Sequence, residues 1–382
     1  MKMNSDLNEK FMLRAIELAK KGTGKTDPNP LVGAVIVKDS KVIAEGYHEK
    51  YGDLHAERNA LKNLKNINEA KNATIYVTLE PCCHQGKQPP CTEALIDAGI
   101  GKVVIGSFDP NPLVSGKGIK ILRDAGIEVV TGYMKKECDE LNPFFFHFIK
   151  YNTPYVALKY AMTADGKIAT KSGDSKWITG EAARRSVHEL RKKYYGILAG
   201  INTVEKDDPM LDVRLPDEPG ARNPVRIVLD DDLRISTESR ILKTAGDIPT
   251  YVVTIKRNPE KAKDIEDKGA HVLLVSKDET GRVAIAELLN KLGEMKIDSI
   301  LVEGGGEVNS SFIKAGAVNK VYVYIGNRIF GGRDALSPIT GEGTDKVKDA
   351  LSLSTPKVST FEDDVLIEYD TKKEEDTCLR DL

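Results

Sequence analysis

The sequence predicts an α/β protein built from two domains. In both halves, short β-rich runs alternate with helical patterns, as in KVVIGS before GKGIKILRDAGI and SILV before another helical run. Such alternation indicates βαβ units and a largely parallel sheet covered on both faces. A length of 382 residues favours two or three domains. The segment 141–155 has four phenylalanines within five residues and ends in an Asn-Thr-Pro hinge, which indicates a packed terminal helix and a boundary. We therefore expect domains at 1–150 and 151–370, followed by a mobile charged tail at 371–382.

Composition excludes several classes of partner. The formal net charge is −2 and the charges are mixed along the chain, so no basic surface for nucleic acid or membrane is expected. Three of the five cysteines are clustered, which does not indicate a disulfide framework. The polar start does not resemble a signal peptide, and no apolar run approaches the ~18 residues of a membrane span. We expect a soluble cytoplasmic protein that binds small molecules and forms a homo-oligomer.

The first eighty residues indicate a helix, a loop and a hairpin, in that order. Apolar residues recur at helical spacing over roughly residues 6–21. The following KGTGKT is not a P-loop, because its first motif glycine is replaced by Ala19 and it follows a helix rather than a strand. AVIVKDSKVIAEGYH then gives two β-rich runs around a turn, which predicts a hairpin.

The residues from His55 to Cys91 carry a metal-ligand pattern. His55 and Glu57 open a predicted helix, and Cys82 and Cys91 follow the strand TIYVTL. Catalytic zinc takes three protein ligands and leaves a fourth position for water. His55, Cys82 and Cys91 fit that count, and Glu57 remains to move protons. Pro81 and Pro89-Pro90 place both cysteines near helix N-termini, where the dipole favours thiolates.

Two alternatives to this ligand set remain open. Cys83 is adjacent to Cys82, but Cys82 directly follows the proline and is the preferred ligand. A structural zinc site would have four protein ligands, and His84 or Cys83 would complete it.

The signature H-x-E with P-C-x-x-C is known from zinc-dependent nucleobase deaminases. Here eight residues separate the cysteines, and PCCHQGKQPPC resembles the deaminase half of the bifunctional riboflavin-biosynthesis deaminase/reductases. The resemblance implies a cytidine-deaminase-like three-layer α/β/α domain. It also implies that zinc activates water and that Glu57 carries a proton to the departing amine of a phosphoribosylaminopyrimidine. It further implies that Asn29, in the rigid DPNP turn, contacts the pyrimidine; taken alone, Asn29 is a turn asparagine. His48, near the end of the hairpin, is either a substrate contact or a surface residue. His84 and Lys87 lie between the two cysteines and are expected to contact a substrate phosphate, with an exposed loop lysine as the alternative for Lys87.

The second half has motifs of its own. LK…DGKIA, SKWITGEAAR, G-x-NTV-x-x-DDP, L-x-V-R and LVEGGG together resemble the reductase half of the same family. The resemblance of this half implies a dihydrofolate-reductase-like α/β domain that uses NADPH. Together, the resemblances of the two halves cover about residues 5–370. No strand is followed by G-x-G-x-x-G, so a standard Rossmann phosphate loop is absent from the sequence. Glu303 and three glycines instead join a strand to a helix, where backbone N–H groups can approach phosphate.

The family resemblance also implies the contacts of the reductase half. The implied cofactor contacts are Ala161, Trp177, Thr203, Asp207, Gly305, Gly306, Glu307, Val308, Asn309, Ser310 and Ser311. The implied substrate contacts are Lys159, Ser175, Arg191, Leu211, Arg214 and Glu303. Arginine suits a sugar phosphate because its guanidinium donates two parallel hydrogen bonds, although helix and loop arginines are usually only solvated. Lys159 is expected to protonate the sugar oxygen as the ring opens. For Trp177, the alternative to cofactor contact is a buried position in the core.

Two other functions compete with this interpretation. A nucleic-acid editing deaminase would need a basic stripe and stacking aromatics, which a net charge of −2 disfavours. In a non-catalytic zinc scaffold, Glu57 would be incidental. Ammonia release from a diaminopyrimidine separates these possibilities, whereas zinc content does not.

Overall fold

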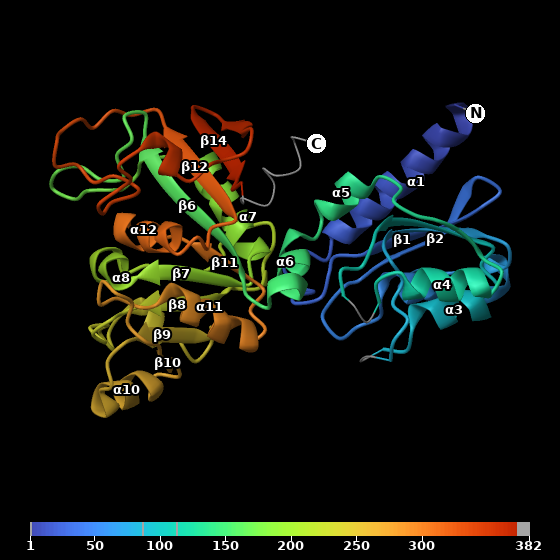
Figure 1. Ribbon diagram of the computed structural model, residues 1–382, viewed down its shortest axis with the longest axis horizontal. Coiled ribbons are helices and arrows are strands. Elements are labelled where there is room, and N and C mark those ends of the chain that lie inside the picture. The colour runs from blue at the N-terminus through green and yellow to red at the C-terminus, as the bar shows by residue number, and fades with distance from the viewer. Residues whose placement is uncertain (1, 86–87, 112–113, 373–382) are drawn as a thin grey trace. The chain divides into compact units, whose positions relative to one another are not determined.

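The computed structural model describes residues 2–85, 88–111 and 114–372. The chain forms two compact units, Met1–Asn152 and Thr153–Leu382, each with its own sheet and core (Figure 1). Among the described residues, no helix is both long enough and apolar enough to cross a membrane.

The first unit is built on a five-stranded sheet with the order β2-β1-β3-β4-β5. β1 and β2 form the predicted hairpin, β1 pairs antiparallel with β3, and β3, β4 and β5 run parallel. The strands are β1 (Gly33–Lys38), β2 (Lys41–Tyr47), β3 (Thr74–Leu79), β4 (Lys102–Ser107) and β5 (Glu128–Val130). The helices are α1 (Lys2–Lys20), α2 (Ala56–Lys62), α3 (Cys91–Asp97), α4 (Lys117–Asp124), α5 (Lys135–Asp139) and α6 (Pro143–Tyr151).

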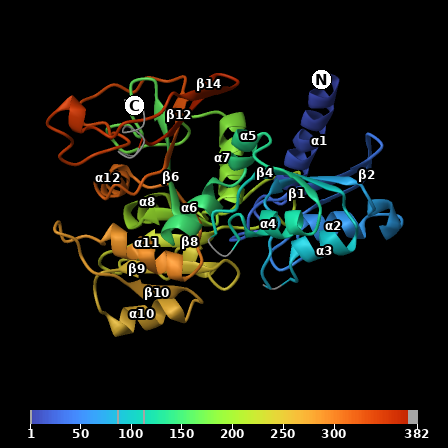
Figure 2. The ribbon, with the colours of Figure 1, turned by 45° about the vertical axis from the view of Figure 1, so that its right-hand side comes forward.

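Alternate strand residues of this sheet belong to two different cores. Ile36 and Ile75 pack in one core with residues of α2, α3 and α4, whereas Val35 and Tyr76 pack in the other with residues of α1. This follows from the period of two along a strand. Figures 1 and 2 show α1 on one side of the sheet and α3 and α4 on the other. The unit is therefore the predicted three-layer α/β/α domain.

The second unit contains a nine-stranded sheet with the order β10-β9-β8-β7-β11-β6-β12-β14-β13. Strands from β10 to β12 run parallel, and β14 and β13 add an antiparallel edge. The strands are β6 (Tyr155–Thr163), β7 (Gly196–Gly200), β8 (Val225–Leu229), β9 (Thr250–Thr254), β10 (His271–Leu274), β11 (Ser299–Val302), β12 (Lys320–Gly326), β13 (Lys357–Phe361) and β14 (Asp364–Asp370).

Helices of the second unit connect the parallel strands, as the alternating sequence pattern predicts. They are α7 (Glu181–Lys193), α8 (Ile201–Asp207), α9 (Arg240–Lys243), α10 (Pro259–Glu266), α11 (Ile285–Glu294) and α12 (Gly306–Lys314). Leu198 and Ile300 pack in one core with residues of α11 and α12, and Ile197 and Val228 pack in another with residues of α8, α9 and α10. The parallel strands therefore end at a common edge, the usual position for ligands in α/β sheets.

Thr371 and Lys372, the first two residues of the predicted tail, are hydrogen-bonded to the second unit. Thr371 donates a backbone hydrogen bond to Asn319 and its hydroxyl donates to the carbonyl of Val318, at 3.0 and 2.7 Å. Lys372 N–H donates to the carbonyl of Ser352 at 3.0 Å. These bonds attach residues 371 and 372 to the ordered domain, whereas residues 373–382 lie outside the described part of the chain. The predicted first helix also begins earlier than expected, at Lys2 rather than near residue 6.

Gly46 in β2 permits the close packing of α2 against this strand. The helix α2 begins directly after His55. A Cβ atom there would lie 2.2 Å from the amide nitrogen of Ala60 and 2.7 Å from the carbonyl oxygen of Ala56. We expect Gly46→Ala to destabilise the first unit by about 1–3 kcal/mol, the usual cost of overpacking. Thermal unfolding measures the effect. Gly246→Ala is the control, because a Cβ there meets nothing within 4 Å; equal shifts in both variants would contradict the prediction.

Candidate active sites

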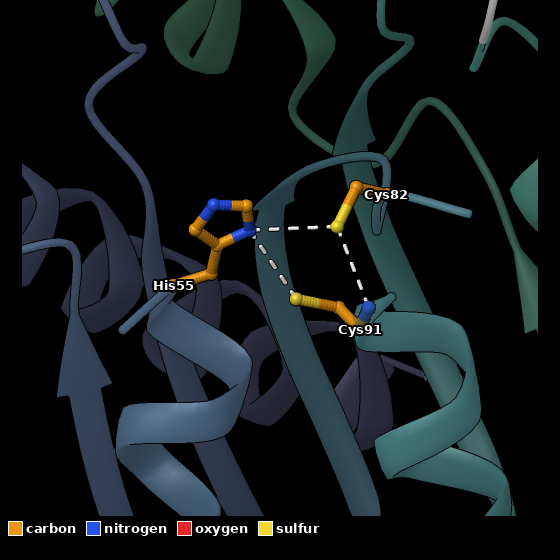
Figure 3. Close-up of side chains that lie close together, drawn as sticks. All are labelled: His55, Cys82 and Cys91. Atoms are coloured by element: carbon orange, nitrogen blue, oxygen red, sulfur yellow. Dashed lines mark hydrogen bonds between the residues drawn. The ribbon is translucent and has the colours of Figure 1, made fainter. Parts of the chain in front are cut away.

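Three side chains in the first unit meet at one point. His55 immediately precedes α2, Cys82 lies in the loop after β3, and Cys91 begins α3. The Nδ1 atom of His55 lies 3.4 Å from the Sγ of Cys82 and 3.5 Å from the Sγ of Cys91 (Figure 3). All three potential ligand atoms lie within 4.8 Å of one another. Two sulfurs and an imidazole nitrogen in this arrangement are the donor set that zinc prefers, with room for a fourth ligand.

The sequence pattern predicted a helix start near each cysteine, but a single helix, α3, begins at Cys91, and its first backbone N–H donates to Cys82. Cys82 begins no helix, but the backbone N–H of Cys91 donates to its sulfur at 3.4 Å. A hydrogen bond from Cys91 lowers the pKa of Cys82, and the same interaction raises the pKa of Cys91. A divalent cation would offset the charge of two thiolates, so the site fits a metal.

Glu57 lies beside this cluster in the first turn of α2 and is only 3% exposed. Burial raises the pKa of Glu57, and the negative charge on Cys82 raises it further. A carboxyl group with a raised pKa can exchange protons near neutral pH, as general acid–base catalysis requires.

Asn29 and His48, which the sequence could place only as possible contacts, lie together near the cluster. The Asn29 amide is 3.2 Å from Nε2 of His48, and Nδ1 of His48 is 3.0 Å from the carbonyl oxygen of Leu54. The carbonyl requires Nδ1 to carry the proton, so Nε2 accepts from Asn29. The rings of His48 and His55 have centroids 5.5 Å apart. His48 is buried, which excludes the surface alternative.

Two buried carboxylates near the cluster were missed by sequence reasoning. Glu80 follows β3 and accepts backbone N–H groups from Gly116 and Ile119 at the start of α4, at 3.1 and 3.4 Å. Asp109 follows β4, and burial raises its pKa to about 6. Their position directly after neighbouring parallel strands was the available signal. Of the predicted phosphate contacts, His84 is exposed, and Lys87 lies outside the described residues.

The second unit has a pocket of about 690 Å³ at the carboxyl ends of its parallel strands. It contains many of the predicted contacts, namely Ser175, Thr203, Asp207, Glu303, Gly305, Gly306, Glu307, Val308 and Ser311. The glycine turn precedes α12, as the sequence predicts, and opens the backbone of that helix start to the pocket. The pocket therefore offers both the size and the N–H groups that a dinucleotide requires.

Several predicted contacts do not line this pocket. Leu211 and Asn309 are buried, and the Asn309 amide donates to the carbonyl of Pro338 at 2.8 Å. Trp177 is 62% exposed, with the Arg184 guanidinium 4.6 Å from its ring centre, so it is not a core tryptophan. Ala161 lies in β6, and Ser310 lies in α12.

Glu303 is the centre of a buried ionic group. Arg191 donates to its two carboxylate oxygens at 2.7 and 3.0 Å, and Nζ of Lys159 lies 3.6 Å away. Burial alone would raise the pKa of Glu303, but Arg191 and Lys159 together lower it to about 2. Burial lowers the pKa of Lys159, and Glu303 opposes that shift. Arg191, predicted as a phosphate contact, is thus buried and shares a carboxylate with Lys159, which excludes the alternative of a merely solvated arginine.

The segment from Leu211 to Arg214 is attached to α7 by two hydrogen bonds. Arg191 donates to the carbonyl of Asp212 at 3.0 Å, and the N–H of Arg214 donates to Nδ1 of His188 at 3.2 Å. Burial and the charges of Arg191 and Arg214 lower the pKa of His188 to about 4. The neutral imidazole therefore brings the two predicted phosphate-binding arginines together without adding a third positive charge.

Family models match both halves of the chain. Residues 5–107 match the cytidine and deoxycytidylate deaminase zinc-binding region, and residues 154–367 match the RibD C-terminal domain. The riboflavin biosynthesis protein RibD of Actinobacillus pleuropneumoniae is 50% identical over 359 residues, which is 94% of each chain. The Escherichia coli RibD is 38% identical over 94% of this chain and 98% of its own.

The chain belongs to the RibD family. A solved structure from Thermotoga maritima, a diaminohydroxyphosphoribosylaminopyrimidine deaminase and 5-amino-6-(5-phosphoribosylamino)uracil reductase, is 40% identical. It covers 97% of this chain and 100% of its own, with a TM-score of 0.85. As a member of the RibD family, the protein is a bifunctional enzyme of riboflavin biosynthesis, with a zinc-binding deaminase half and a reductase half. The predicted family, fold class and class of function are confirmed.

The metal cluster predicts different effects for its neighbouring cysteines. Cys82→Ser and Cys91→Ser should each lose bound zinc, because each removes a sulfur from the cluster. Cys83→Ser should retain it, since the Cys83 sulfur is not among the three clustered ligand atoms. Metal analysis of the purified proteins is the measurement, with reductase activity as the control for folding. Equal zinc loss in Cys83→Ser would show a different ligand set.

His188 predicts a pH-dependent stability. Its pKa falls from 6.5 in the unfolded chain to about 4 in the folded one, so protonation favours unfolding. The stability linked to His188 is complete above about pH 6.5 and is lost as the pH falls towards 4. His188→Asn keeps an acceptor for the Arg214 N–H but does not titrate. Urea unfolding between pH 7 and 4.5 should therefore show a shallower loss in the variant, and identical slopes would refute the assignment.

Proposed function

We propose that residues 1–150 hydrolyse the 2-amino group of 2,5-diamino-6-(5-phosphoribosylamino)pyrimidin-4(3H)-one and release ammonia. Residues 151–370 then use NADPH to reduce the ribosyl side chain of 5-amino-6-(5-phosphoribosylamino)uracil to ribityl. The observation that carries the proposal is one chain with two separate sites of suitable chemistry: a His-Cys-Cys cluster beside a buried glutamate, and a dinucleotide-sized pocket beside a buried lysine. The activities named for the Thermotoga maritima relative support it.

In the deaminase half, His55, Cys82 and Cys91 hold zinc. Zinc bound there lowers the pKa of a coordinated water and supplies a nucleophile at neutral pH. Glu57 would move the proton between the nucleophile and the departing amine, a role for which its raised pKa is suited.

The other deaminase residues bind and orient the substrate. The Asn29 amide, positioned by His48 at 3.2 Å, contacts the polar edge of the pyrimidine. His84 and Lys87 contact the 5-phosphoribosyl group. Asp109, with its pKa raised to about 6, is a further group able to bind the polar substrate in this half.

In the reductase half, NADPH supplies the hydride that is transferred to C1′ of the ribosyl group. Ser175, Leu211 and Glu303 contact the substrate, and Lys159 protonates the ring oxygen as the sugar opens. Burial lowers the pKa of Lys159, and Glu303, 3.6 Å away, opposes that shift and so favours the protonated lysine that the step needs. Arg191 and Arg214 bind the 5′-phosphate. Arg191 donates two hydrogen bonds to Glu303, whereas Arg214 is exposed and pairs with Asp212 through Nη1, so Arg214 is the more accessible of the two guanidinium groups.

The cofactor lies along the pocket in this proposal. Gly305 and Gly306 contact its pyrophosphate through the start of α12, a helix of nine residues whose N-terminus attracts anions. The remaining cofactor contacts are Ala161, Trp177, Thr203, Asp207, Glu307, Val308, Asn309, Ser310 and Ser311.

The proposed setting is the cytoplasm, where cysteine ligands remain reduced and available to zinc. The proposed partners are the two phosphoribosylaminopyrimidine substrates and further copies of the same chain.

Glu57→Gln separates the deaminase chemistry from zinc binding. We expect the variant to retain zinc, because the three ligands are unchanged, and to lose deamination by roughly 10²–10⁴-fold. Ammonia release from the diaminopyrimidine is the measurement, and NADPH consumption with the aminouracil substrate is the control. Loss of zinc together with loss of activity would show that Glu57 is a ligand. If the wild-type protein releases no ammonia from this substrate, the deaminase proposal itself fails.

A further inference from the structure

The order of strands in the second sheet fixes an order of groups along the pocket. β6, β11, β7 and β8 are consecutive neighbours and parallel, so their carboxyl ends lie side by side. Lys159 lies in β6, Glu303 follows β11, and Arg234 follows β8. Neighbouring strands are about 4.8 Å apart, so the end of β8 is roughly 14 Å from that of β6. A dinucleotide with its reactive ring near Lys159 and its pyrophosphate at Gly305 therefore places its adenosine at the end of β8.

Arg234 is one of three described cations that line the pocket, and it follows β8. Its Nη2 donates to Oδ1 of Asn202 at 2.7 Å, and its Nη1 lies 3.2 Å from Oε2 of Glu205. Both partners lie in α8, which follows β7, so Arg234 connects the ends of β7 and β8. The Arg234 side chain is 45% exposed and Glu205 is 42% exposed. Exposed ion pairs contribute little, so an incoming phosphate can replace Glu205 as a partner of the guanidinium.

Arg282 and Lys206 also line the pocket, and each lies against a different part of its wall. Arg282 lies 3.3 Å from the carboxylate of Glu307 and also faces Asp231, whose carboxylate accepts the N–H of Val283 at 3.2 Å. The charge of Asp231 is thus balanced by Arg282. Lys206 lies beside the loop that carries Ser175, because its Nζ is 2.6 Å from the position of a Cβ on Gly173. Arg234 differs from these two cations in its position, because its contacts with Asn202 and Glu205 hold it between the ends of β7 and β8, where the adenosine would lie.

We propose that Arg234 binds the 2′-phosphate of the adenosine ribose and thereby selects NADPH over NADH. The inference deepens the proposed reductase function and rests on it. A guanidinium offers two parallel donors that match phosphate geometry. NADH has only a hydroxyl at the same position and gains no ion pair there.

The test is a binding measurement that requires no turnover. Isothermal titration calorimetry of the full chain compares 2′,5′-ADP with 5′-AMP, two probes that differ only in the 2′-phosphate. We expect the wild-type protein to prefer 2′,5′-ADP. Arg234→Gln should weaken 2′,5′-ADP roughly 10- to 100-fold and leave 5′-AMP unchanged, since one charge-assisted contact is lost.

Arg282→Gln is the matched control, because Arg282 lines the same pocket, is 43% exposed and is also paired with a glutamate. It should keep the preference for 2′,5′-ADP. Parallel weakening of both probes by Arg234→Gln, or loss of the preference through Arg282→Gln instead, would overturn the proposal. A protein that shows the Arg234-dependent preference yet does not reduce the aminouracil would support the Arg234 assignment and refute the reductase function.

Discussion

The parallel pairing of neighbouring strands is the constraint on which both sites depend. Because parallel strands end at the same edge, side chains far apart in sequence become neighbours there. In the first unit, the ends of β3 and β4 present Cys82 and Asp109. In the second, the ends of β11, β7 and β8 present Glu303, the start of α8 and Arg234. Each site is thus assembled from strand ends, the loops that follow them and neighbouring helices, over the cores of its own unit.

Both sites contain buried charged groups, and the two sites stabilise these charges in different ways. Two thiolates and an imidazole call for a cation, which makes the first site a metal centre. In the second, Arg191 and Lys159 surround Glu303 and lower the pKa of Glu303 to about 2, so the carboxylate remains ionised, while Glu303 opposes the lowering of the Lys159 pKa by burial. Removing one member of such a buried group leaves its partners unpaired, at a cost far above that of an exposed pair. The buried groups are therefore rigid parts of the sites, whereas exposed pairs such as Arg234 with Glu205 can exchange partners.

Much of this protein was determined by its sequence alone. Periodicity gave the alternating strands and helices, because apolar residues must face a core at the period of the element that carries them. The zinc cluster could be predicted because His55, Cys82 and Cys91 are metal-ligand residue types at a spacing typical of a zinc site. The proton-transfer role of Glu57 was then predicted from its position two residues after His55. The family resemblance was carried by motifs such as PCCHQGKQPPC and LVEGGG, which are local in sequence.

Only the tertiary structure decided which distant groups meet. Glu80 and Asp109 carry no motif of their own, and their importance appears only when β3 and β4 pair and bury them. Arg191 looked like a solvated helix arginine until Glu303, 112 residues away, supplied its partner. The attachment of Thr371 likewise depends on Val318 and Asn319, which no local pattern connects to it. Local sequence sets propensity and residue chemistry, whereas burial and charge pairing depend on contacts that form only when the chain folds.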